Sequence, residues 1–159
     1  MQKFNYHTHT YRCGHADNNM MDEEYVKELI KYANYIKKAI ELNIPDIIAH
    51  PDLYMLDREI FGQAEKETAE IICQAAEKHN IPLEINLSEP SMYLSKLKDT
   101  IKYPCKEFWN VASNYNVRVI YGVDAHFKDQ IRQYEESIGI DNEIIGKDII
   151  DKLNFCEEL

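Results

Sequence analysis

The chain has 159 residues, 45% of them hydrophobic, and this length allows one domain, over residues 1–159, with a core of its own. Its 18 basic and 28 acidic residues give a net charge of −10, which would repel the phosphates of a nucleic acid, so we expect no nucleic-acid partner. No segment approaches the about 20 consecutive apolar residues of a membrane span, and the first residues do not resemble a signal peptide, so we expect a cytoplasmic protein with no membrane partner.

Short apolar or β-branched runs alternate along the chain with longer runs in which apolar residues recur at spacings of three and four. The first pattern is typical of buried strands and the second of amphipathic helices. In chain order we predict a strand over 3–7, a helix over 22–42, a strand over 46–50, a helix over 63–79, a strand over 82–87, a helix over 104–115, a strand over 118–123, a short strand over 140–145 and a closing helix over 147–154. This alternation predicts an α/β fold with mainly parallel strands and right-handed crossovers.

Side chains that can bind metals or transfer protons stand where the predicted strands end. His7 ends the first strand and His50 the second, Glu84 lies in the third, and Asp124 and His126 follow the fourth. In α/β folds of this kind, ligands bind at the carboxyl ends of the parallel strands. We therefore expect these side chains to lie at one edge of the sheet.

Two pairs of residues have the spacing of neighbouring metal ligands. Residues two apart in an extended segment point to the same side, so His7 and His9 can present both imidazoles to one cation, and Asp124 and His126 repeat the spacing. Imidazoles with a carboxylate suit zinc, manganese or iron. A site with three protein ligands leaves room for a water whose pKa the metal lowers toward about 7. The pattern predicts a metal site with this water as the nucleophile.

Several of these residues also have a plainer interpretation. A single His-x-His pair can be structural, and Cys13, beside the histidines, is either a soft-metal ligand or a packing residue. Glu84 needs a partner on its buried strand: it is a metal ligand, a carboxylate that orients a ligating histidine, or a salt-bridged core acid, and we favour the second. His79, near a helix end, is interpreted as a surface residue with no assigned function.

Taken together, the motifs resemble those of the polymerase-and-histidinol-phosphatase (PHP) superfamily, and within it the histidinol-phosphatase-like branch. The opening His-Thr-His-Thr-x-x-Cys-Gly-His-Ala over 7–16 resembles the first metal motif of that family. Ala-His-Pro-Asp-Leu over 49–53 resembles its His-Pro-Asp motif, and Gly-Val-Asp-Ala-His over 122–126 its terminal Asp-x-His motif. The resemblance covers nearly the whole chain, up to about residue 130.

This resemblance implies a fold related to a distorted seven-stranded (β/α) barrel, a cluster of one to three divalent ions (zinc, manganese or iron), and hydrolysis of phosphate esters. The ligands that it implies are His7, His9 and Asp124 for one metal, His50 for a second, and His15 and His126 for a third.

Part of the family pattern is missing between His15 and His50. The family has a further histidine after its second strand, a bridging glutamate after its third and another histidine after its fourth, whereas here one predicted helix runs straight into the strand that bears His50. We therefore expect an incomplete (β/α) barrel-like fold of about four or five parallel strands, because closing a filled barrel takes about eight. Open sheet edges predict a homo-oligomer, in which one chain can supply ligands to another's site; the alternative is an open-sheet monomer whose helices cover both faces.

The implied function is that of a metal-dependent phosphatase. It would hydrolyse a small phosphate monoester, such as histidinol phosphate, by means of a metal-bound hydroxide, with Asp124 and His126 as catalytic residues. Arg12 and Arg58 are either phosphate contacts, because a guanidinium holds two oxygens at once, or surface charges. The missing ligands leave two alternatives: a related metal-binding protein with little or no catalysis that acts as an oligomeric or regulatory module, and a metal-dependent hydrolase of another ester or an amide.

Overall fold

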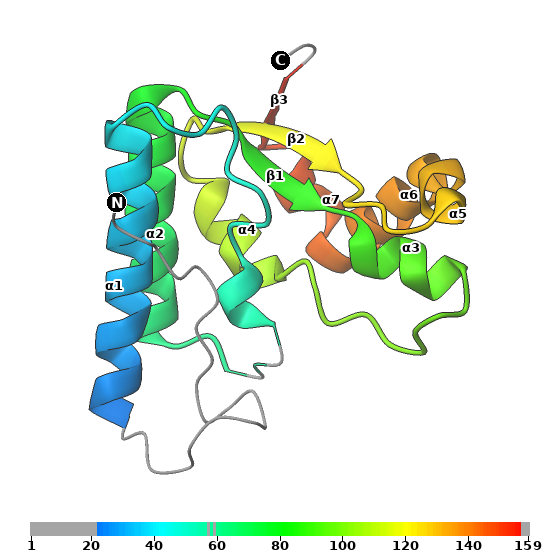
Figure 1. The fold of residues 1–159 in the computed structure, drawn as a ribbon, viewed down its shortest axis with the longest axis horizontal. Coiled ribbons are helices and arrows are strands. Elements are labelled where there is room, and N and C mark those ends of the chain that lie inside the picture. Colours follow the sequence, from blue (N-terminus) through cyan, green and yellow to red (C-terminus); the bar gives the residue numbers. More distant parts are fainter. Residues whose placement is uncertain (1–21, 57, 59, 157–159) are drawn as a thin grey trace.

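Helices and strands follow one another along the chain in the manner of an α/β protein (Figure 1). The computed structural model describes residues 22–56, 58 and 60–156. Its elements are α1 (Asp22–Glu41), the 3-10 helix η2 (Leu53–Met55), α2 (Gln63–His79), β1 (Leu83–Asn86), α3 (Ser88–Leu94), α4 (Lys106–Ala112), β2 (Arg118–Gly122), α5 (Lys128–Arg132), α6 (Tyr134–Ile145), α7 (Lys147–Ile150) and β3 (Asn154–Phe155).

The strands form one open parallel sheet in the order β1-β2-β3. β1 and β2 pair from Leu83↔Val119 to Asn86↔Gly122, and β2 also pairs with the two residues of β3. On the other side of β1, Ile48 makes a single parallel bridge to Leu83. The described part of the chain is therefore a mixed α/β structure with an open sheet of three parallel strands, not a closed barrel.

Two of the predicted strands are wrong. The segment 46–50 contributes only the bridge at Ile48, because His50 adopts a φ of 35° and ends the extended conformation. The segment 140–145 is helical and belongs to α6. Along α6 the buried residues Ser137, Asp141 and Ile145 recur every four positions, and the helix packs against α3 and α4.

The predicted closing helix over 147–154 is shorter than expected. α7 ends at Ile150, and the chain then places Asn154 and Phe155 beside β2 as the third strand. The ring of Phe155 stacks on that of Tyr121, with the centroids 4.9 Å apart, so an aromatic contact anchors this short strand. The predicted strand over 3–7 lies outside the described residues. We expected four or five parallel strands, and the described residues form a sheet of three.

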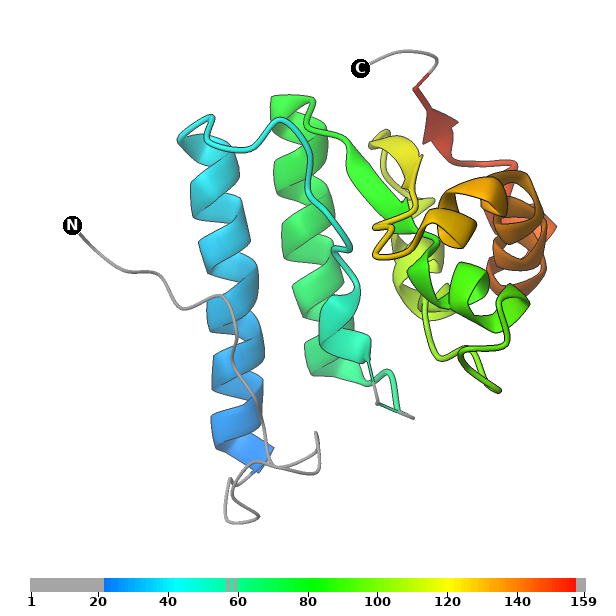
Figure 2. The ribbon, with the colours of Figure 1, turned by 45° about the vertical axis from the view of Figure 1, so that its right-hand side comes forward.

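The two longest helices stand side by side, and α2 also packs on α4 (Figures 1 and 2). α1 buries Tyr25, Leu29, Ala33 and Ile40 along one face; the last three belong to its predicted apolar spacing, whereas Val26, which began that spacing, is exposed. α2 ends at Asn80, whose φ of 56° is the left-handed conformation of a helix C-cap. The helices predicted over 22–42 and 63–79 are therefore confirmed.

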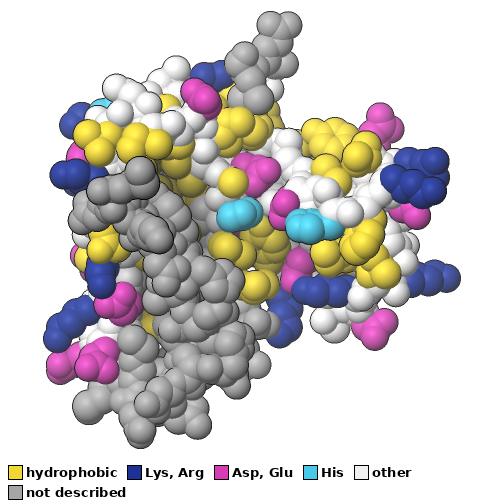
Figure 3. Space-filling model, viewed as in Figure 1, with side chains coloured by type: hydrophobic (Ala, Val, Ile, Leu, Met, Phe, Trp, Pro, Cys, Tyr) yellow, Lys and Arg dark blue, Asp and Glu magenta, His cyan; other side chains and the backbone are white. Residues whose placement is uncertain are grey.

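Because β1 and β2 are parallel and Asn86 pairs with Gly122, their carboxyl ends meet at one edge of the sheet. Histidine and acidic side chains gather near this edge in the middle of the molecular face (Figure 3). No helix in the described part of the chain is both long enough and apolar enough to cross a membrane.

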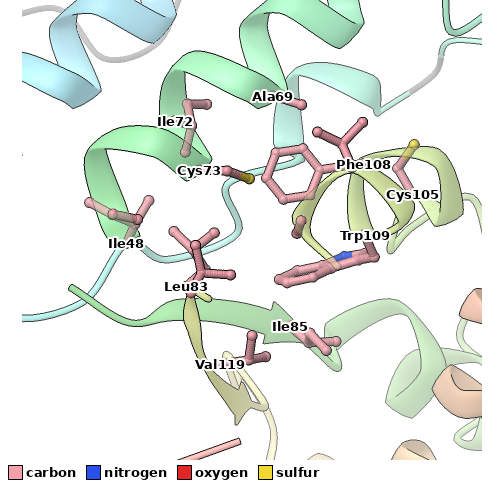
Figure 4. Close-up of a cluster of buried hydrophobic side chains, with 14 of the residues drawn as sticks. Ile48, Ala69, Ile72, Cys73, Leu83, Ile85, Cys105, Phe108, Trp109 and Val119 are labelled. Atoms are coloured by element: carbon pink, nitrogen blue, oxygen red, sulfur yellow. The ribbon is translucent and has the colours of Figure 1, made fainter. Parts of the chain in front are cut away.

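The core lies between the sheet and the helices α2 and α4 (Figure 4). Its fully buried side chains include Ile72, Cys73, Leu83, Ile85, Phe108, Trp109 and Val119. The rings of Phe108 and Trp109 meet edge to face with their centroids 5.2 Å apart, a geometry that adds about 1 kcal/mol to the gain from burial. This packing fixes α4 against the strands whose ends carry the candidate site.

Candidate functional site

Glu84 is the residue that ties the strand ends together. Its Oε2 accepts a hydrogen bond from the backbone N–H of His50 at 2.9 Å and another from Nδ2 of Asn86 at 3.3 Å. Its carboxylate also lies across Gly122, because a Cβ placed on that glycine would be 1.8 Å from Glu84 Oε1. Glu84 thus bridges the His50 turn, β1 and β2. The structure shows Glu84 in contact with the backbone of the candidate ligand His50. It therefore holds the His50 turn through the main chain.

The His50 turn is held a second time by Asp52. This fully buried carboxylate accepts hydrogen bonds at Oδ2 from the backbone N–H of Cys105 at 2.8 Å and from the Trp109 indole at 3.2 Å. Burial, with a smaller contribution from the nearby Glu84 carboxylate, raises the pKa of Asp52 to about 7, although its hydrogen bonds oppose the shift. Asp52 therefore anchors the turn to the start of α4.

The second turn with candidate ligands follows β2 and contains Asp124 and His126. His126 Nδ1 lies 2.8 Å from the backbone carbonyl oxygen of Asp124. A carbonyl oxygen only accepts, so Nδ1–H is the donor in this contact, and Nε2 is the ring nitrogen on which the neutral tautomer has its lone pair. Histidines that ligate metals commonly have one ring N–H fixed on a carbonyl in this way. The side chains of His126 and Asp124 are 62% and 47% exposed, with Nδ1 and Oδ1 4.0 Å apart.

The structure shows that Arg58 is not a surface charge, whereas its role as a phosphate contact stays a prediction. Its side chain is 7% exposed and forms an ion pair with Glu65 of α2, which is 5% exposed. The guanidinium carbon also lies 4.1 Å from the centroid of the Tyr25 ring. In this structure the guanidinium is enclosed by these two contacts, and among the described residues its Nε and Nη1 have no hydrogen-bond partner.

Two buried polar residues of this region had no assigned role in the sequence analysis. Asp52 lies inside the His-Pro-Asp motif, so its position next to a candidate ligand was a usable signal. Gln130 was detectable as the third residue after Phe127, the spacing of a capping box at a helix start. Burial and partners were not readable from the sequence, because both residues bond to segments distant along the chain or to backbone atoms.

The remaining predicted site residues, His7, His9, Arg12, Cys13 and His15, lie outside the described residues. Within residues 22–56, 58 and 60–156, no three His, Cys, Asp or Glu side chains are grouped so that they could hold a metal ion. In chemical kind, however, the imidazoles and carboxylates gathered at the strand ends suit zinc, manganese or iron.

Comparisons of the chain with protein-family models, with curated proteins and with solved structures gave no match. The function is therefore inferred from the chain's own residues. Of the two turns that carry them, the His50 turn is held to the sheet by Glu84 and to α4 by Asp52, and the backbone of the His126 turn is bonded to Gln130.

Proposed function

We propose that the chain is a metal-dependent phosphomonoesterase related to the histidinol-phosphatase-like branch of the PHP superfamily. One observation supports this most: the parallel ends of β1 and β2 and the turn after Ile48 bring imidazole and carboxylate groups from separate segments to one sheet edge. Such edges are where α/β proteins bind their ligands. In this proposal the open sheet is part of an incomplete barrel.

The proposed metal ligands are His50, Asp124 and His126, together with His7, His9 and His15. When bound, divalent ions would lower the pKa of a water molecule and neutralise the charge of the phosphoryl oxygens. The chain's own contribution is to present the Asp124 carboxylate and the Nε2 lone pair of His126. Glu84 holds the backbone of the His50 turn. Arg12 and Arg58 are the proposed phosphate contacts, and Arg58 in addition pairs with Glu65.

The test combines metal content with turnover. We would purify the full chain after expression with added zinc, manganese or iron, measure metal per chain, and assay phosphate release from histidinol phosphate and from an aryl phosphate. We expect bound metal and turnover that falls by at least about 100-fold in His126→Ala and Asp124→Ala, because each removes a ligand. His79→Ala is the matched control, since it removes an imidazole at the far end of α2.

Each outcome has a defined meaning. Metal binding without any turnover would favour the alternative of a metal-binding module with little or no catalysis. Hydrolysis of other esters or amides, but of no phosphate ester, would favour the alternative of a metal-dependent hydrolase with a different substrate. A chain that takes up no metal under any of these conditions would contradict the proposal.

A further inference from the structure

Gln130 of α5 connects the His126 turn to the rest of the molecule. Its side chain is fully buried, and its Oε1 accepts hydrogen bonds from the backbone N–H groups of His126 at 2.7 Å and Phe127 at 3.0 Å. Both donors belong to the turn that carries the candidate ligands. One amide oxygen therefore fixes two consecutive peptide units beside the site.

The other end of the same amide is bound to α3. Nε2 of Gln130 donates to Oγ of Ser91 at 2.9 Å, and Ser91 Oγ donates to the backbone carbonyl of Ser88 at 2.8 Å. The helices α3 and α5 lie next to each other beyond the strand ends (Figures 1 and 2). Gln130 thus has a partner for each amide atom, which is the condition for a buried amide to stabilise a structure.

The chain of hydrogen bonds continues back to the first turn. The N–H of Ser88 donates to Oδ1 of Asn86 at 2.9 Å, and Nδ2 of Asn86 donates to Oε2 of Glu84 at 3.3 Å. The same Glu84 oxygen accepts the backbone N–H of His50. A continuous path of short contacts therefore joins the backbones of the two turns that carry the described candidate ligands.

We propose that Gln130 is a positioning residue of the site, which holds the Asp124–His126 turn at a fixed place relative to the His50 turn. This inference rests on the proposed function. A helix as short as α5, with five residues, has little stability of its own, so the turn before it needs a tertiary anchor. Metal ligands need positions fixed to within roughly 0.5 Å, which a buried, fully bonded amide can provide.

The test uses Gln130→Leu, which keeps much of the side-chain volume but removes both polar atoms. Two readouts on the full chain are needed: hydrogen exchange of the His126 and Phe127 amides without metal, and the affinity for Mn²⁺ by calorimetric titration. We expect both amides to exchange about tenfold faster or more. We also expect Mn²⁺ to bind about 10-fold to 100-fold more weakly, the range for residues that orient ligands.

Three comparisons separate positioning from general stability. Gln133→Leu is the matched control. Gln133 follows α5, and its Oε1 accepts a hydrogen bond from Oγ of Ser95, at the end of α3, at 2.7 Å, so it also joins these two helices but through a bond outside the His126 turn. It should lower stability but leave Mn²⁺ affinity unchanged. Gln130→Glu keeps an acceptor for both N–H groups and should restore slow exchange. If Gln130→Leu fails to fold, Ser91→Ala cuts only the far anchor and should show the same two effects, each smaller.

A double variant identifies the residue through which Gln130 acts. If it acts through the Asp124–His126 turn, His126→Ala with Gln130→Leu should weaken Mn²⁺ binding by clearly less than the product of the two single losses, because only the part of the effect that acts through Asp124 remains. Multiplied losses, or unchanged exchange in Gln130→Leu, would overturn the inference while leaving the proposed function intact. A wild-type chain that binds no Mn²⁺, zinc or iron would remove both.

Discussion

His50 and Asp124 share a backbone conformation that L-residues seldom adopt. Their φ angles are 35° and 44°, in the left-handed region where a Cβ costs about 1 kcal/mol relative to glycine. Both follow the extended segments that end at the candidate site. Non-glycine residues in such conformations concentrate at functional sites, which agrees with the ligand role proposed for both residues.

The two positions allow a direct comparison of glycine with alanine. Both His50→Gly and His50→Ala remove the imidazole, but only the alanine keeps a Cβ in the left-handed region. We expect His50→Gly to be more stable than His50→Ala by about 1 kcal/mol in denaturant unfolding, and the Asp124 pair to behave in the same way. Equal stabilities within each pair would show that the left-handed conformation carries no such cost.

Gly122 makes room for the carboxylate of Glu84. A methyl group at this position would displace that carboxylate and leave the backbone N–H of His50 without its acceptor. We expect Gly122→Ala to lower the free energy of unfolding by about 1–3 kcal/mol. The control is Gly139→Ala on α6, where a Cβ meets nothing within 4 Å and should stabilise the helix by about 0.5–1 kcal/mol. Urea unfolding of both variants checks the pair, and a neutral Gly122→Ala would contradict this role of Glu84.

Asp141 is a buried acid that the proposed site does not use. It is fully buried on α6, and among the described residues neither carboxylate oxygen has a hydrogen-bond partner. Burial, with a smaller contribution from Asp52, raises the pKa of Asp141 to about 8, against about 3.9 in an unfolded chain. The folded protein therefore keeps a proton on this group that the unfolded chain loses.

This difference predicts how stability depends on pH. Between about pH 4 and pH 8, unfolding releases the proton of Asp141. The contribution of this group to the free energy of unfolding is therefore complete below pH 4. It is lost as the pH rises toward 8, by on the order of 1 kcal/mol per pH unit. Asp141→Asn should have a flatter dependence over this range. Glu143→Gln, at an exposed position of the same helix, is the control for the loss of one acid. Identical slopes in wild type and Asp141→Asn would refute the assignment.

At the scale of elements, the buried pair of Arg58 and Glu65 fastens the segment after η2 to the first turn of α2. Glu65 also accepts the backbone N–H of Gly62 at 3.0 Å, which places it at the N-terminal cap of the helix. The carboxylate therefore neutralises a buried guanidinium and helps to begin α2. This double role gives Arg58, which the sequence offered as a phosphate contact or a surface charge, a buried structural partner.

Removing one partner of this pair should be costly. Glu65→Gln keeps an acceptor for Gly62 but leaves the Arg58 guanidinium buried without its counterion, and we expect a loss of about 3 kcal/mol in thermal or urea unfolding. Arg58→Met combined with Glu65→Gln should recover part of the loss. Glu67→Gln, at an exposed position of α2, should change stability little. An equally stable Glu65→Gln would mean that the pair contributes nothing measurable.

At the scale of the whole molecule, the sheet is open. Beyond β1 the described residues add only the bridge at Ile48, and three strands are too few to close a barrel. Uncovered strand edges favour association, so we expect the purified chain to be at least a dimer of its 18.7 kDa protomer by light scattering. A single species with the protomer mass at all concentrations would contradict this expectation.

The sequence by itself determined the elements whose signal is local. The apolar spacing of α1 and α2 is a property of one segment, and the strands over 82–87 and 118–123 were readable as buried runs. The position of Asp124 and His126 after a strand was readable for the same reason. These features need no knowledge of the partner segment.

Tertiary structure alone decided the features that depend on a partner. The run 140–145 has no period that separates strand from helix, and packing of α6 on α3 and α4 made it helical. The segment over 46–50 became a single bridge because His50 turns away from extension, and Arg58 met Glu65. Gln130 joined the His126 turn to α3 through bonds that no spacing encodes. A short apolar segment shows from its sequence which residues prefer burial. The segments that they pack against, and the structure that they adopt there, depend on contacts made in the folded protein.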